Sequence, residues 1–204
     1  MSTEENKDLI KRDSSFLQKA GNQISITNKL LTIYKEKDVE QDLVSSYKDE
    51  FKKLKEEFEE KLKLIEEYLE KGGIKNNLKD YKGAIEDYTK AIELYPKAEA
   101  YLRRGVTKHN LKDYKGATED YTKAIELKPE DCSYYGKRGN AKNKLGDKEG
   151  AVLDWRKAIE LATKTIELNP KNELAYETRA FAKTNLGDKE GADLDWKRAV
   201  ELGC

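Results

Sequence analysis

Side chains that could carry out catalysis are few in this sequence. It has one histidine, His109, and two cysteines, Cys132 and Cys204. A catalytic histidine or cysteine needs a partner that activates it, and none of the three stands in a recognisable pattern with another. Paired carboxylates are frequent, but a chain with 40 acidic residues produces many by chance. Phosphate-binding glycine loops and the HExxH and CxxC metal motifs do not occur in the sequence. The sequence therefore predicts a protein that is not an enzyme and that needs no metal or cofactor.

The many charged residues do not indicate nucleic-acid or membrane binding. Lys and Arg number 40 and Asp and Glu number 40, so the formal net charge is zero, although charged residues make up 39% of the chain. This balance argues against a basic nucleic-acid binder or a polybasic membrane protein. The start, MSTEENKDLI, has no secretory signal pattern, and no apolar run is long enough to span a membrane. We expect a cytoplasmic protein.

One sequence motif recurs four times after the first third of the chain. DYKGAIEDYTKAIEL at 80–94 returns as DYKGATEDYTKAIEL at 113–127, and in altered form at 147–161 and 188–202. The three prolines of the chain each close a copy. Equivalent alanines lie at Ala84, Ala117, Ala151 and Ala192, and repeats spaced like these are typical of stacked helical pairs. A hydrophobic content of 37% suits such a thin architecture, in which every helix keeps a face in water.

Each copy predicts two antiparallel helices. In the second copy they are expected over about 99–111 and 114–127. An aspartate precedes the second helix of every copy, where its carboxylate can accept hydrogen bonds from unpaired backbone amides. These N-cap residues are Asp80, Asp113, Asp147 and Asp188.

The residue before each N-cap is expected to adopt a left-handed backbone conformation. Gly146 and Gly187 hold this place in the third and fourth copies and suit it. Lys79 and Lys112 hold it in the first two copies, at a cost of roughly 1 kcal/mol each if they adopt the same conformation.

Small and aromatic residues also recur at fixed places. Gly105, Ala117 and Ala124 of the second copy suit a close approach of two helices, and an aromatic side chain fills the remaining gap. The aromatic residues at this place are Tyr88, Tyr121, Trp155 and Trp196. The pattern resembles the tetratricopeptide repeat family, in which a helix-turn-helix unit of 34 residues stacks into a superhelix.

The resemblance implies an all-α solenoid over residues 65–204. Its four units would cover 65–97, 98–131, 132–172 and 173–204. The third unit is seven residues longer, because ATKTIEL follows KAIEL as a local duplication, and its second helix is expected to run from about Lys148 to Leu168. This extension could be a ledge for a partner or a neutral insertion.

Two columns of opposite charge accompany the repeat. A basic residue precedes the small residue of each first helix, and an aspartate precedes the aromatic residue of each second helix. The basic residues are Lys71, Arg104, Arg138 and Arg179, and the aspartates are Asp87, Asp120, Asp154 and Asp195. We predict that they form one ion pair within each unit, the alternative being two independent solvated columns.

The two ends of the chain are open to more than one interpretation. Residues 1–64 predict a helical hairpin with a coiled-coil-like apolar stripe, whose second arm continues from about Val39 into the first unit. The hairpin would either cap the first repeat or serve as a dimerisation or docking arm. No solvating helix follows the last unit, so Leu194, Val200 and Leu202 could be exposed and support homo-oligomers.

The family resemblance implies a binding groove on the concave face formed by the first helices of the units. By register, the groove residues are Asn76, Asn77, Arg103, His109, Asn110, Lys137, Asn140, Asn143, Lys144, Thr184 and Asn185. Asparagine can bond a ligand's backbone through both donor and acceptor, and Arg103, Lys137 and Lys144 favour an acidic peptide. An ordinary hydrated groove is the alternative.

The predicted function is a protein–protein interaction adaptor or scaffold; the alternative is a self-assembling structural protein.

One subclass of the family clamps the carboxyl terminus of heat-shock chaperones with Lys and Asn side chains. The corresponding places here hold Leu69, Gly73, Arg103, Ser133 and Lys137. Moving the register by one unit does not improve the match. The sequence therefore does not predict this clamp.

Overall fold

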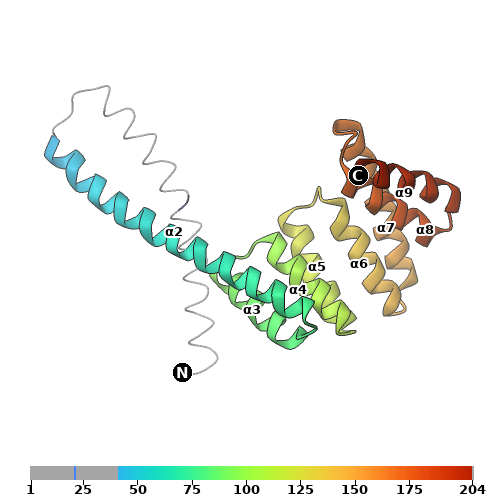
Figure 1. Cartoon of the computed structure of the whole chain (residues 1–204), viewed down its shortest axis with the longest axis horizontal. Coiled ribbons are helices and arrows are strands. Elements are labelled where there is room, and N and C mark those ends of the chain that lie inside the picture. The colour runs from blue at the N-terminus through green and yellow to red at the C-terminus, as the bar shows by residue number, and fades with distance from the viewer. Residues whose placement is uncertain (1–20, 22–40, 204) are drawn as a thin grey trace.

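The computed structural model describes residues 21 and 41–203, and the chain is helical throughout the longer range apart from short turns. The helices are α2 (Gln41–Asn77), α3 (Tyr81–Leu94), α4 (Ala98–Asn110), α5 (Tyr114–Leu127), α6 (Cys132–Lys144), α7 (Lys148–Leu168), α8 (Glu173–Leu186) and α9 (Lys189–Gly203). Each helix packs on the next, and α2, α4, α6 and α8 also contact one another in turn. The result is the predicted all-α solenoid, a curved row of helical pairs (Figure 1).

Helix α2 is much longer than the other first helices of the units. It runs without interruption from the amino-terminal segment into the first unit, in agreement with the continuous arm expected from the sequence. Its carboxyl-terminal half packs on α3, with Ile65 fully buried among Phe58, Leu62 and Ala91. Its other end extends away from the stacked pairs (Figure 1). The rest of the predicted hairpin, apart from Gly21, lies outside the described residues.

The aspartate caps form as predicted. Asp113 Oδ1 accepts a hydrogen bond of 2.9 Å from the Gly116 amide. The other three caps make the same bond to a glycine three residues on. A Cβ at Gly116 would lie 2.2 Å from the capping carboxylate, so this close approach explains why a glycine follows each cap at this spacing.

The two helices of each of the first three units pack closely, because an aromatic ring of one helix lies directly against a glycine of the other. A Cβ at Gly72, Gly105 or Gly139 would come within 2.6–2.9 Å of the facing ring. The rings of Tyr88, Tyr121 and Trp155 are 2–4% exposed. Trp196 departs from this pattern, because it is 40% exposed.

The extended helix of the third unit has the predicted bounds, but its added turns do not simply project as a ledge. Ala162 is fully buried with Cys132 and Ala175, at the starts of α6 and α8. Thr163 Oγ1 accepts a hydrogen bond of 3.2 Å from Arg179 of the last unit. The duplicated segment therefore helps to hold the last unit in place, while its end, at Leu168, is 80% exposed.

The four left-handed positions occur where the sequence predicted them. Gly146 and Gly187 have φ angles of 87° and 88°, and Lys79 and Lys112 have φ angles of 63° and 66°. Within the described part of the chain, no helix is both long and apolar enough to cross a membrane.

These positions give a direct test of backbone strain. Gly146→Ala is expected to lower the free energy of unfolding by about 1 kcal/mol, because a Cβ there meets no neighbour and only the left-handed conformation is penalised. Lys112→Gly should not lower it, because glycine adopts this conformation freely. Urea denaturation measures both changes; equal losses in the two variants would contradict this account.

Candidate functional site

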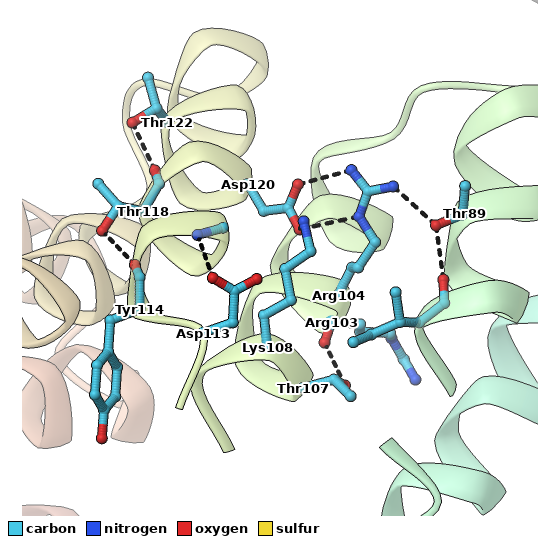
Figure 2. Close-up of polar contacts among 12 residues, drawn as sticks. Thr89, Arg103, Arg104, Thr107, Lys108, Asp113, Tyr114, Thr118, Asp120 and Thr122 are labelled. Atoms are coloured by element: carbon cyan, nitrogen blue, oxygen red, sulfur yellow. Dashed lines mark hydrogen bonds and ion pairs between the residues drawn. The ribbon is translucent and has the colours of Figure 1, made fainter. Parts of the chain in front are cut away.

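The first helices of the units are fixed by a polar cluster that repeats along the solenoid. In the second unit, Arg104 donates to both carboxylate oxygens of Asp120, at 2.9 and 2.7 Å, and Lys108 Nζ lies 2.8 Å from the same carboxylate. Arg104 also donates to Thr89 Oγ1 of the preceding unit at 2.9 Å (Figure 2). Arg104 of α4 therefore contacts both α5, the second helix of its own unit, and α3, the second helix of the preceding unit.

The third and fourth units repeat this cluster. Arg138 binds Asp154 and Thr122, and Arg179 binds Asp195 and Thr163, with a lysine four residues on, Lys142 or Lys183, completing each. Each arginine also lies over a tyrosine ring of its own helix. The predicted ion pairs are therefore confirmed in three units. They are not solvated, because these aspartates are only 3–4% exposed.

The first unit does not follow the predicted pairing. Lys71 lies on the surface, 3.5 Å from Glu67, and does not bind Asp87. Lys75, one turn further along, lies 2.7 Å from Asp87 instead, and this hydrogen bond raises the pKa of Lys75. The prediction for Lys71 was wrong because a lysine at that position lacks the planar fork with which arginine spans two carboxylate oxygens and a hydroxyl.

The predicted groove residues fall into two groups. Some are already engaged within the fold: Asn76 accepts from Thr107 Oγ1 at 3.1 Å, and Thr184 and Asn185 bond backbone carbonyls of their own helix. Arg103 donates to Glu99 at 3.0 Å. Asn77, Asn110 and Asn143 are exposed near the carboxyl-terminal ends of their helices.

Three of the predicted residues gather around α6. Lys137 and Lys144 are exposed and form no ion pair within residues 41–203. His109 of α4 is half-buried, with its ring edge-on to Tyr114 at 5.0 Å between centroids. Burial lowers the pKa of His109, and the positive charges of Lys144 and Lys137 lower it further. The histidine is therefore neutral at pH 7, and the positive charge here comes from the two lysines.

Sequence reasoning missed the apolar part of the concave face. Leu174, Phe181 and Trp196 border a cavity of about 280 Å³ together with Lys137 and Asn140. A signal was present in the repeat register. Leu174 and Phe181 occupy the places of Ser133 and Asn140 in the unit before, so a polar pair is replaced by an apolar pair.

The described residues contain no cluster of three or more histidine, cysteine or acidic side chains arranged to hold a metal ion. Cys132 is buried and forms no disulfide within the described residues, and burial raises the pKa of its thiol. Cys204 lies outside the described residues. The arrangement on the concave face can therefore offer positive charge, hydrogen bonds and apolar contact to a ligand.

The sequences of the first two repeat units match models of a known repeat family. Tetratricopeptide repeat models match residues 66–97 and 98–131. The chain contains tetratricopeptide repeats. These matched segments coincide with the helical pairs α2–α3 and α4–α5, and the following two pairs repeat the same contacts. No curated protein matches this tetratricopeptide repeat chain in sequence.

Solved tetratricopeptide repeat domains share the fold. The first such domain of Spaghetti (RPAP3), bound to the HSP90 peptide SRMEEVD, is 25% identical, with a TM-score of 0.50 over 61% of this chain and 94% of that one. The TPR2B domain of yeast Sti1, in a complex with pHsp70, is 23% identical, with a TM-score of 0.50 over 59% and 97%. The Sgt2 domain from Aspergillus fumigatus is 20% identical, with a TM-score of 0.50 over 62% and 81%.

The buried carboxylate of Asp195 predicts a specific acid sensitivity. Burial alone would raise the pKa of Asp195, but hydrogen bonds and charge from Arg179 and Lys183 outweigh burial and lower it. The ionised carboxylate is thus favoured in the folded state. It contributes stability above the ordinary aspartate pKa of about 3.9, and this contribution is lost as the pH falls through the lower folded value.

Asp195→Asn is therefore expected to lower the free energy of unfolding by about 3 kcal/mol at pH 7, because Arg179 and Lys183, both partly buried, lose their counter-charge. The difference from wild type should shrink as the pH falls from about 4 to about 2. Urea denaturation across this range measures it, with Asp193→Asn, an exposed change on the same helix, as the control. A constant difference at all pH values would contradict the proposed ion pairing.

Proposed function

We propose that this protein is a non-enzymatic adaptor that binds a peptide or helix of a partner protein on the concave face of α4, α6 and α8. The observation that carries the proposal is the contrast among the basic residues of these helices. Arg104, Lys108 and Arg138 bind buried aspartates. Lys137 and Lys144 have no ion pair within residues 41–203, so their charge remains available to an acidic ligand.

The rigidity of the repeat cluster supports this role. Bidentate arginine–aspartate contacts fix the first helices of the second to fourth units, so the concave residues are held in place before a ligand arrives. Preorganisation of this kind reduces the ordering cost of binding. We expect moderate binding affinities, as are typical of small, transient interfaces.

A peptide-binding relative also supports the proposal. The Spaghetti (RPAP3) domain has the same fold and is bound to an HSP90 peptide. The matching clamp positions here hold Leu69, Gly73, Arg103, Ser133 and Lys137, of which only two are basic. We therefore propose a peptide ligand with acidic character without assigning the heat-shock peptides themselves.

A selection from a phage-displayed library of random twelve-residue peptides tests the proposal. Peptides selected by the wild-type chain would be titrated by fluorescence anisotropy against wild type and Lys137→Glu/Lys144→Glu. We expect about tenfold or greater weakening in the double variant, because attraction becomes repulsion, and weaker binding at higher salt. Lys115→Glu/Lys148→Glu, exposed changes on α5 and α7, is the matched control and should bind normally. Failure to select any peptide, or equal binding by both double variants, would contradict the proposal.

Self-assembly is a second candidate function, favoured by the exposed last helix. Leu194 and Val200 of α9 are each 65% exposed, whereas Ile125, at the same register as Val200, is 9% exposed beneath the following unit. In this candidate function, α9 of a second copy packs on this exposed face.

Light scattering after size-exclusion chromatography tests this candidate. If α9 mediates association, the wild-type mass should rise with concentration, and Val200→Glu should reduce association because it places a charge in the contact. The exposed change Lys115→Glu is the control. A monomer at every concentration would exclude this function and leave the adaptor proposal intact.

A further inference from the structure

The cavity on the concave face lies between α6, α8 and α9. Its volume is about 280 Å³, just below the range of about 300–1,000 Å³ that holds a drug-sized ligand. Gly136, Lys137, Leu174, Thr178, Phe181 and Trp196 are among the residues that line it. A space of this size and lining suits one large side chain rather than a free metabolite.

Three departures from the repeat create this cavity. Gly136 stands where the first two units have Leu69 and Leu102, so a side chain is missing from its floor. In the last unit Ala180 replaces the glycine against which the aromatic rings of other units pack. No unit covers Trp196 from the far side within the described residues, and Trp196, which lines the cavity, is 40% exposed.

Part of the cavity wall, formed by Leu174 and Phe181 of α8, is apolar. Leu174 is 55% exposed, and Phe181 is half-buried beside it. Apolar side chains gathered around a hollow on a surface are typical of contact sites for another protein. An apolar side chain of a ligand bound there would bury both its own apolar surface and that of the cavity wall, which favours binding.

The charge at the rim determines which peptide fits. Lys137 lines the cavity and forms no ion pair within residues 41–203. Lys144 follows it two turns along the same helix, so the positive side of the groove continues directly from the apolar one. Glu177 on the opposite wall is half-buried and disfavours an acidic group on its own side.

Resting on the groove function proposed above, we infer that this cavity is an anchor site for one large apolar side chain (leucine, isoleucine, methionine or phenylalanine) of the partner peptide. A neighbouring acidic residue of that peptide lies at Lys137. The anchor selects among acidic peptides, because charge attraction alone distinguishes them poorly.

Filling the cavity from the protein side tests the anchor. Gly136→Leu restores the residue found at this register in the first two units, and a Cβ at Gly136 lies 3.6 Å from Thr178 Cγ2, an ordinary contact. The variant should therefore fold, as circular dichroism would verify. Leu174→Asn, at an exposed position, removes apolar wall without adding volume and serves as the second variant.

The probes are the peptides selected from the random twelve-residue library, together with versions in which each large apolar residue is replaced by alanine. We expect a large apolar residue beside Asp or Glu to be enriched in the selection. Its replacement, Gly136→Leu and Leu174→Asn should each weaken binding by about tenfold or more. Lys115→Leu, which adds an apolar side chain at an exposed site of α5, should bind as wild type does.

Tryptophan fluorescence gives an independent measurement, because the chain has two tryptophans and Trp155 is 4% exposed. In Trp155→Phe, bound peptide should protect Trp196 from acrylamide quenching, and its alanine version should protect less. Peptides that bind through Lys137 and Lys144 but tolerate every cavity variant, and leave Trp196 unprotected, would overturn the anchor while the adaptor proposal stands. Failure to select any peptide would overturn both.

Discussion

The buried aspartate of each second helix is the interaction on which the rest of the solenoid depends. Asp120, Asp154 and Asp195 lie in the interior with almost no exposure, where an unpaired carboxylate would be strongly unfavourable. An arginine and a lysine from the facing helix satisfy each one. Since the loss of either partner leaves a buried charge, the two helices of a unit have one favourable register, and this sets the pitch of the array.

The same arginines connect the units to one another. The hydroxyls of Thr89, Thr122 and Thr163 each accept a hydrogen bond from an arginine of the next unit, so the polar cluster crosses the boundary between units. The duplicated segment of α7 shows how far this constraint extends. It lengthens the helix by two turns, yet it places Thr163 where Arg179 can reach it.

Rigid spacing leaves the concave face free to vary. Residues that hold the helices together repeat almost unchanged, whereas the concave positions change from unit to unit. Between the third and fourth units, for example, Ser133 and Asn140 are followed by Leu174 and Phe181 at the same register. Selectivity for a ligand can therefore evolve at these positions without disturbing the contacts that determine the fold.

The sequence alone determined the helix pairs, the caps, the left-handed turns, the long α7 and three of the four ion pairs. These features depend on local backbone preferences and on the spacing of residue types, which are visible in a repeated sequence. Tertiary structure decided that Lys75 rather than Lys71 binds Asp87, and that Asn76 accepts a hydrogen bond from Thr107 of the next unit. It also decided where Trp196 is exposed beside Gly136. These outcomes depend on the distances between side chains on neighbouring helices, and the spacing of residues along the chain does not determine those distances.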